Sequence, residues 1–338
     1  MSADLTIISP LSWVQEAFKE YFGKAHMSDN SHSNVAFDYG FEPACDLEED
    51  SAVWITPDLL IANNVWRERN SLPALRFTAP AADWLATLPE ELRGRTVITV
   101  PVSNIRAWAE LPEGLSERPW SQLSRGRVPE FRAARRGLSE LQQDLGDAPA
   151  DSLITINTHI DGIKEEWCVI INHGKAVASS GYCVHRSADE ESHDILTVFD
   201  EARFHDSYRT IAESAATQAA QVSHLDNASI IVGFRETDGD MGNATSSTTK
   251  TGNCHSAISA AIPQLLIIEA DPVWCTTPYT FETAQGIKAF LNAISDCRII
   301  ENNDGTFKNR NGQRAPKADI YTPDPWMIRH AEHRYDRF

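Results

Sequence analysis

Two acidic residues at the end of an apolar segment are the first candidates for chemistry in this sequence. Glu269 and Asp271 follow Leu265–Ile268 and are separated by one alanine. Side chains of an extended strand alternate with a period of two, so both carboxylates point to the same side. Magnesium takes hard oxygen ligands of this kind together with substrate phosphates. The pattern predicts a magnesium site at a strand end, and acids paired with nearby arginine or lysine are the alternative.

A predicted β-hairpin carries a third acidic candidate. Two apolar runs, Trp167–Asn172 and Ala176–Val184, lie on either side of a short segment that contains His173 and Gly174. A short turn of this composition between apolar runs is typical of a hairpin. Glu166 comes just before the first run. Acids at a strand start are usually solvated, so the hairpin alone leaves open whether Glu166 faces a ligand.

Basic residues gather between residues 109 and 130. Arg118, Arg125 and Arg127 occur there among prolines and glycines, which predicts loops and short strands around a basic spot. The formal net charge of the chain is −18. That charge disfavours non-specific binding to nucleic acid or to an anionic membrane, because such partners need a positive field. A local basic spot can still bind a small polyanion such as ATP.

The composition indicates a folded protein rather than a disordered one. Of the 338 residues, 42% are hydrophobic, which is enough to fill a core in two lobes or one enlarged α/β unit. The six cysteines are scattered without a Cys-x-x-Cys pair, so reduced thiols are favoured over a structural zinc site. The N-terminal residues lack the pattern of a signal peptide, and no apolar run is long enough for a membrane helix. We therefore expect a cytoplasmic protein.

Strands and helices are expected to alternate along the chain. Residues 237–253 have almost no apolar side chain, so we expect an exposed loop between two neighbouring strands. The period of the apolar residues predicts helices at residues 10–22, from Trp84 to near Gly94, at 204–222 and at 281–294, and strands at 53–61 (broken by Pro57), 96–102, 153–157, 229–234 and 265–270.

Four short motifs occur in a fixed order and cover most of residues 78–330. They are Thr78–Pro80 continuing to Arg95, Glu166–Gly174 with Ser179–Tyr182, Glu269–Trp274 with Pro278-Tyr279, and Tyr321–Trp326 with Ile328-Arg329. In this order they resemble the ATP-grasp superfamily, in particular the clade named for one arginine and two lysines in its nucleotide site. The resemblance rests on the order of the motifs, because each is short.

The resemblance implies an α+β ATP-grasp fold in which two α/β lobes enclose a nucleotide cleft, preceded by an N-terminal pre-ATP-grasp-like lobe. The expected domains are residues 1–95, an ATP-grasp core at 96–285, and a C-terminal helix and tail at 286–338. It implies ATP and Mg²⁺ as cofactors and a ligase that joins a carboxylate to an amine or similar nucleophile through an acyl phosphate. The substrate would be a small molecule or peptide with a carboxylate, and the oligomeric state is left open.

The resemblance also assigns site residues. Glu269 and Asp271 fall on the metal positions, Arg118 and Glu166 on catalytic and nucleotide-binding positions, and Arg125 and Arg127 are the nearest candidates for a second basic position.

The sequence departs from the family pattern at several positions. Asp271 stands where asparagine is usual, Cys168 where arginine is customary, and Val232 near the place of a metal-binding acid. These departures keep a second possibility open, a degenerate ATP-grasp protein that binds nucleotide or a partner without turnover. A phosphotransferase or an unrelated α/β fold is a further alternative.

Overall fold

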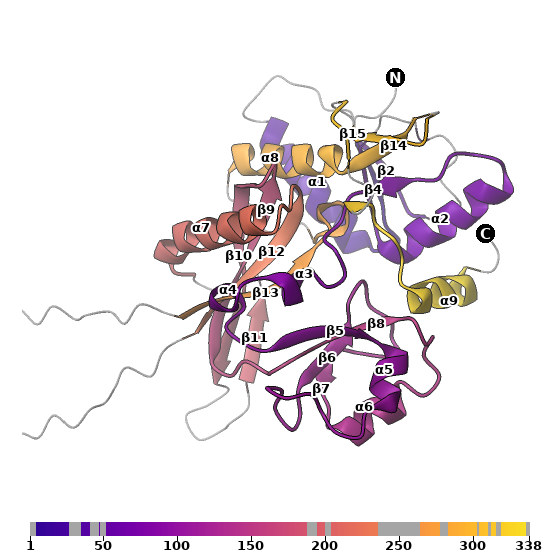
Figure 1. Cartoon of the computed structure of the whole chain (residues 1–338). Helices are drawn as coiled ribbons and strands as arrows, with labels where there is room; N and C mark the ends of the chain where they lie inside the picture. Colours follow the sequence, from indigo (N-terminus) through magenta and orange to yellow (C-terminus); the bar gives the residue numbers. More distant parts are fainter. Residues whose placement is uncertain are drawn as a thin grey trace, which may run out of the picture.

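The computed structural model describes residues 5–26, 35–40, 47, 52–187, 195–199, 204–235, 264–277, 283–302, 304–309, 312–315 and 319–335. It confirms the predicted α+β class, with four sheets and helices on several of their faces (Figure 1). No helix in these described ranges combines the length and apolar character that crossing a membrane requires.

Three parallel strands form the N-terminal sheet, in the order β2-β1-β3. The strands β1 and β3 are buried throughout, as expected for parallel strands covered on their faces. The bounds are β1 Leu5–Ile8, α1 Ser12–His26, β2 Val35–Asp38, β3 Ala52–Ile55 and α2 Pro57–Arg69. The strand expected at residues 53–61 ends at Ile55, and α2 begins at Pro57, because proline suits the first position of a helix.

A four-stranded antiparallel sheet, in the order β5-β8-β6-β7, is built from the middle of the chain and is called the middle sheet. Figure 1 shows it as a separate unit with α5 and α6 on its outer side. Its core includes Ile154, Ile156 and Leu141, and Trp326 of the C-terminal helix α9 packs into it. The bounds are β5 Val97–Pro101, α5 Val102–Ala107, β6 Trp120–Leu123, β7 Ala134–Arg135, α6 Leu138–Asp144, β8 Leu153–Asn157 and α9 Pro325–Arg334.

The largest sheet is antiparallel and has five strands in the order β11-β10-β9-β12-β13. Alternate residues of β9 face opposite sides. Trp167, Val169 and Ile171 pack in the cluster that contains α7, whereas Cys168 and Ile170 pack in the cluster that contains α8. The bounds are β9 Ile163–Asn172, β10 Lys175–Ser187, β11 Ile195–Phe199, α7 Asp206–Val222, β12 Ala228–Arg235, β13 Gln264–Asp271 and α8 Ala284–Asp296.

The predicted hairpin is confirmed as β9 and β10. Asn172 pairs with Lys175, and the two residues between them, His173 and Gly174, have φ angles of 52° and 68°. Two positive φ angles are typical of the tight turn that matches the twist of a hairpin. The predicted helices at 10–22, 204–222 and 281–294 correspond to α1, α7 and α8, with small shifts at their ends.

The single helix expected from Trp84 to Gly94 is instead two short helices. The first, α3 Trp84–Thr87, ends before Pro89, and the second, α4 Glu90–Arg93, begins after it. Proline cannot continue a helix, because it lacks the backbone N–H and its ring displaces the preceding turn. Gly94 then ends α4 with a positive φ of 59°.

Short elements connect the N-terminal sheet with the later part of the chain. A small sheet in the order β15-β14-β4 joins Arg76–Phe77 (β4) to Arg298–Glu301 (β14) and Phe307–Asn309 (β15). A 3₁₀ turn, η1 Val273–Cys275, follows β13. Phe290 of α8 packs in the same core as Phe18 of α1. The predicted domain limits at residues 95 and 285 stay a prediction.

Two sequence predictions concern residues outside the described part of the chain. They are the polar segment Thr237–Asn253 and the Pro278-Tyr279 motif. The strands on either side of the polar segment are neighbours, as expected, because Arg235 of β12 pairs with Gln264 of β13.

Candidate functional site

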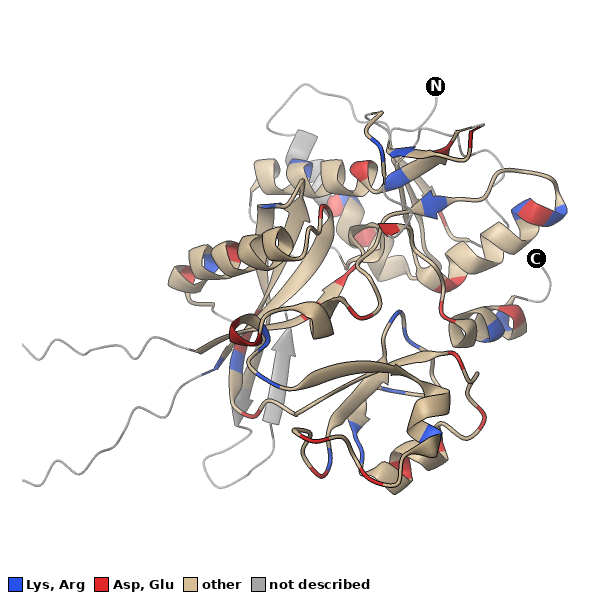
Figure 2. Ribbon diagram, in the orientation of Figure 1, with Lys and Arg blue, Asp and Glu red and all other residues tan. Residues whose placement is uncertain are grey.

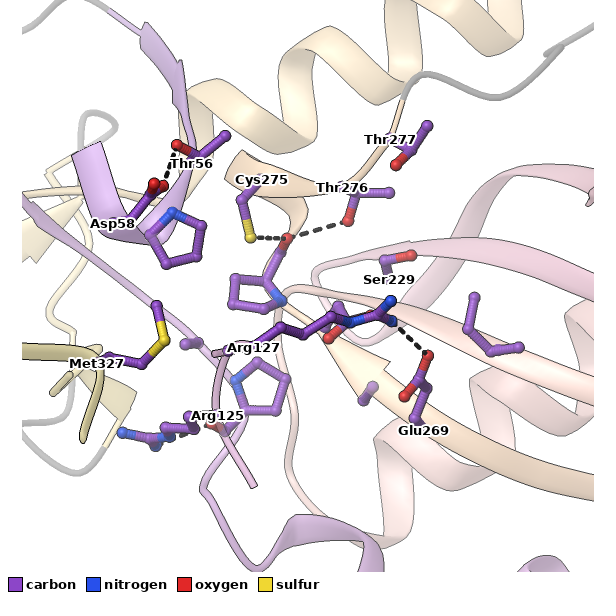
Figure 3. A pocket seen from close by; sticks show the side chains of 18 of the residues that line it. Thr56, Asp58, Arg125, Arg127, Ser229, Glu269, Cys275, Thr276, Thr277 and Met327 are labelled. Atoms are coloured by element: carbon purple, nitrogen blue, oxygen red, sulfur yellow. Dashed lines mark hydrogen bonds and ion pairs between the residues drawn. The ribbon is translucent and has the colours of Figure 1, made fainter. Parts of the chain in front are cut away.

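A pocket of about 790 Å³ opens beside the ends of β9, β10, β12 and β13. A second pocket of about 550 Å³ adjoins it and is lined by residues of both the middle sheet and β13, so it lies between the middle sheet and the five-stranded sheet. Arg127, Glu269 and Asp271 line both pockets, and Figure 3 shows Arg127 reaching toward Glu269. The predicted acid pair therefore lies where the two pockets meet.

Glu269 lies near two side chains from the middle sheet and its β6–β7 loop. Nε2 of Gln122 in β6 lies 3.5 Å from its Oε2, and Nη2 of Arg127 lies 3.9 Å from its Oε1. A register shift in β13, between the residues paired with Ile231 and Val232, comes just before Glu269. Bulges of this kind turn side chains toward a site.

The acid pair is electrostatically unfavourable without a cation. Burial and the neighbouring Asp271 raise the pKa of Glu269 to about 7, while Arg127 opposes this rise. Burial also raises the pKa of Asp271 above its usual range. Two desolvated carboxylates on one strand face repel each other, and a bound divalent cation would relieve this repulsion. Their oxygen atoms suit magnesium, so the residues present fit this ion.

The three predicted arginines occupy different environments. Arg127 is on the loop between β6 and β7, and its side chain is 88% exposed. Arg125 also lines the larger pocket, but its guanidinium donates to the carbonyl oxygens of Thr322 and Pro80. Arg118 is not among the described residues that line either pocket, and its Nη2 lies 2.9 Å from Glu140. The structure thus brings Arg127 to the acid pair and leaves Arg118 apart from it.

Basic positions are spread over many elements of the ribbon rather than gathered in one stripe (Figure 2).

Arg118 lies away from the pockets because it comes just before β6. At this end of β6, Trp120 pairs with Arg135 of β7. Its partner Glu140 is in the first turn of α6 and also accepts a hydrogen bond from the backbone of Gly137. Arg118 therefore stabilises the start of α6.

Glu166 lines the larger pocket, and its assigned role in nucleotide binding stays a prediction. Oε1 of its carboxylate lies 2.9 Å from Nε2 of His185, and the hydroxyl of Tyr182 donates to its Oε2. Cys183 also lines this pocket, with its Sγ 3.5 Å from Nε2 of His185. The sequence analysis missed Cys183 and His185. The predicted strand ended at Val184, before His185, and the shift in the register of β10 at Tyr182, which places Cys183 opposite Glu166, had no local sequence signal.

Two of the three departures from the family pattern, Cys168 and Val232, are buried neutral or apolar side chains in the structure. Cys168 is fully buried, its Sγ lies 3.1 Å from Oγ of Ser229, and burial raises its pKa to about 12. Val232 is also fully buried and packs with the residues under α7. Neither position places an ionised group in the pocket.

Arg95 connects the middle sheet to β13 at the residues just before Glu269. Its guanidinium donates to the carbonyl oxygens of Ile267 and Ile268 and to Oδ1 of Asn157 in β8, and burial lowers its pKa to about 10. These bonds fix the strand that carries Glu269 against the middle sheet. Arg95 belongs to the first of the four sequence motifs.

Comparisons with known proteins give remote structural matches only. No family model and no curated protein sequence matches the chain. The structure is similar to D-alanine–D-alanine ligase from Bacillus anthracis, with a TM-score of 0.47 and 10% identity over 87% of this chain and 97% of that chain. It is also similar to the ATP-grasp ligase PsnB, with a TM-score of 0.43 and 10% identity over 87% of this chain and 100% of that chain. At 10% identity and TM-scores below 0.5, these likenesses leave the ATP-grasp resemblance a prediction from the sequence.

Proposed function

We propose that this protein binds magnesium–ATP between its middle sheet and its five-stranded sheet and acts as an ATP-dependent ligase. It would join a carboxylate to an amine or a similar nucleophile. The observation that carries this proposal is the half-buried pair of acids on β13, which lies beside Arg127 at the junction of two pockets. The two carboxylates suit a metal ion. The guanidinium of Arg127, 3.9 Å from Glu269, suits the phosphate chain of a nucleotide bound to that ion.

The acids and the arginine would have separate tasks. Glu269 and Asp271 would hold the ion, which neutralises charge on the phosphoryl group when it is bound. Arg127 would contact the phosphate oxygens through charge-assisted hydrogen bonds. Glu166 faces the same pocket and would contact the nucleotide or its ion.

In the proposed reaction, the substrate carboxylate attacks the terminal phosphoryl group of ATP and releases ADP. The amine then attacks the acyl phosphate, the amide bond forms, and inorganic phosphate leaves. The acyl phosphate would form at the junction of the two pockets, where it has to be kept from water.

The two pockets offer space for two ligands. The smaller one is lined by Trp84, Leu85, Leu123, Val128 and Phe131, an apolar lining that suits a flat base. The larger one extends to Thr56 and Asp58 at the start of α2, where the carboxylate or amine substrate would lie. Both volumes are in the usual range for small-molecule sites.

A second candidate is nucleotide binding without turnover. It is favoured by the position of Arg118, which pairs with Glu140 away from the pockets, and by the buried, neutral side chains at Cys168 and Val232. With Arg118 paired elsewhere, fewer cationic side chains would contact the phosphates of a bound nucleotide than the family pattern implies.

The cytoplasm is the proposed location. Cys168, Cys183, Cys275 and Cys297 are free thiols in the described part of the chain. Free thiols are typical of a reducing compartment.

The test combines a melting experiment with an activity assay. We expect magnesium–ATP to raise the melting temperature, and phosphate to be released when pooled amino acids or peptides are added. A raised melting temperature with no phosphate release under any substrate pool would favour binding without turnover. No change in melting temperature at millimolar magnesium–ATP would contradict both candidates.

A further inference from the structure

Three side chains of different chemistry converge on one part of the pocket wall. They are Glu166 of β9 and Cys183 and His185 of β10, and their ligand atoms all lie within 4.8 Å of one another. The closest separations are 2.9 Å between Oε1 of Glu166 and Nε2 of His185, and 3.5 Å between that nitrogen and Sγ of Cys183. Ligands around a tetrahedral zinc ion lie roughly 3.3–3.8 Å apart, from bond lengths of about 2.0–2.3 Å. Only small movements would bring the three atoms to that geometry.

The backbone of β10 explains this convergence. Gly181 pairs with Trp167 of β9, and Cys183 pairs with the next residue, Glu166, so Tyr182 is an extra residue in the strand. A bulge of this kind turns side chains that would otherwise alternate. Tyr182 and Cys183 consequently both line the pocket.

The carboxylate of Glu166 is also oriented from outside the cluster. Tyr182 donates its hydroxyl hydrogen to Oε2, which leaves Oε1 directed at His185. Metal-binding carboxylates are commonly held by an outer hydrogen bond of this kind. The side chains of Glu166 and His185 are 12% and 22% exposed, so the cluster is mostly shielded but reaches the pocket.

We propose that Glu166, Cys183 and His185 form a three-ligand site for a zinc-type ion, with its fourth position directed into the larger pocket. A thiolate and an imidazole select borderline and soft metals, whereas magnesium prefers oxygen ligands only. The site is therefore chemically distinct from the acid pair of β13. A simple His–Glu ion pair would explain two of the three side chains but not the thiol beside them.

An open fourth coordination position would allow the ion to bind water or a small molecule. Zinc sites with three protein ligands bind water or a substrate donor in the fourth position and act on it as a Lewis acid. Here the open position faces the pocket that extends to Asp58, so the ion would bind a carboxylate or thiolate of a small molecule there. This inference goes beyond the proposed ligase activity and does not depend on nucleotide binding.

Cobalt is a suitable probe, because it replaces zinc and absorbs light when a thiolate binds it. The full-length protein, freed of metals with a chelator, is titrated with Co²⁺ without nucleotide. We expect a thiolate-to-cobalt charge-transfer band that saturates at one ion per chain and disappears when Zn²⁺ is added. Cys183→Ser should remove the band. His185→Gln should weaken binding more than about 100-fold, since even the loss of an outer partner costs about 10–100-fold.

Two controls separate this site from its surroundings. Cys275→Ser removes a thiol that lines the same pocket outside the cluster and should keep the band. Glu269→Gln with Asp271→Asn removes the acid pair and should also keep it. Glu166 is left unchanged in these variants, because it belongs to the proposed nucleotide site as well.

Several results would overturn the proposal. They are the absence of a charge-transfer band in the wild type, an unchanged band in Cys183→Ser, or loss of the band in Cys275→Ser or in the acid-pair variant. If Cys183→Ser does not fold by circular dichroism, Tyr182→Phe decides, with an expected 10–100-fold loss of cobalt affinity. An unchanged affinity in Tyr182→Phe would then count against the site. Failure of magnesium–ATP binding would leave these results unaffected, so the two proposals are tested separately.

Discussion

The two faces of the five-stranded sheet both carry apolar core, but only one of them also carries acids at its strand ends. On the face that packs against α7, Trp167, Val169 and Ile171 are almost completely buried among apolar neighbours. On the other face, the strand ends place Glu166, Glu269 and Asp271 around the pocket. Desolvated carboxylates cost stability, whereas buried apolar side chains supply it. The face under α7 is thus stabilised by apolar contacts, whereas the opposite face also carries the acids at which we propose that ligands bind.

This difference explains how the sheet tolerates an unfavourable group of acids. The alanines of α7 (Ala212, Ala216, Ala219 and Ala220) let the helix approach the sheet closely, and Arg209 lies 5.0 Å from the ring of Trp167. On the pocket side, Arg95 fixes β13 through two backbone carbonyl groups. The strands are thus held by contacts that do not involve the pocket acids.

The largest expected effect comes from the stabilising face. Trp167 is 1% exposed, so Trp167→Ala should lower the free energy of unfolding by about 3–5 kcal/mol. Ser229→Ala is the matched control on the pocket face. It removes the hydroxyl next to Cys168 and should cost about 1 kcal/mol. Urea denaturation of the two variants measures this difference, and equal losses would contradict the division between the faces.

An intermediate effect is expected for Arg127. Arg127→Ala removes the exposed cation near Glu269 and should weaken ATP binding about tenfold, or about 1.4 kcal/mol, through lost phosphate contacts. Arg118→Ala is the control, because that side chain pairs with Glu140 outside the pockets. Calorimetric titration of ATP with both variants would show the effect. A larger loss of ATP affinity in Arg118→Ala than in Arg127→Ala would instead assign Arg118 to the nucleotide site.

A smaller effect should appear in the pH dependence of stability without metal. The pKa of Glu269 is raised from 4.5 to about 7, so the folded protein binds the extra proton between these values while the unfolded chain has released it. The contribution of Glu269 to stability therefore falls as the pH rises from about 4.5 to about 7. Glu269→Gln should match the wild type near pH 5 and be relatively more stable near pH 8. Parallel stability curves for the two proteins across this range would contradict the assignment.

Much of the pocket could be predicted from local sequence. The apolar run before Glu269 identified a strand, and the spacing to Asp271 predicted that both acids lie on one side of it, where both line the pockets. The hairpin of β9 and β10 followed from the turn at His173 and Gly174. These predictions succeeded because they depend on neighbouring residues, for which strand and turn geometry are decisive.

The remainder depends on contacts between distant segments. Whether Arg118 or Arg127 reaches the acids is decided by how the β6–β7 loop lies against β13, which no local pattern specifies. The cluster of Cys183 and His185 was missed because the register of β10 shifts at Tyr182. A single extra residue in a strand reverses which side chains face the pocket, and it has no clear sequence signal.

The central claim is that Glu269 and Asp271 hold the magnesium of a bound nucleotide. Its most direct test is calorimetric titration of ATP with and without magnesium, on the wild type and on Glu269→Gln with Asp271→Asn. We expect magnesium to strengthen ATP binding to the wild type by about 100-fold, or about 2.7 kcal/mol, and to have little effect on the variant. The variant without ligand should be as stable as the wild type or more stable, because a repelling pair is removed. Equal affinity of the wild type for ATP in the presence and absence of magnesium would contradict the claim.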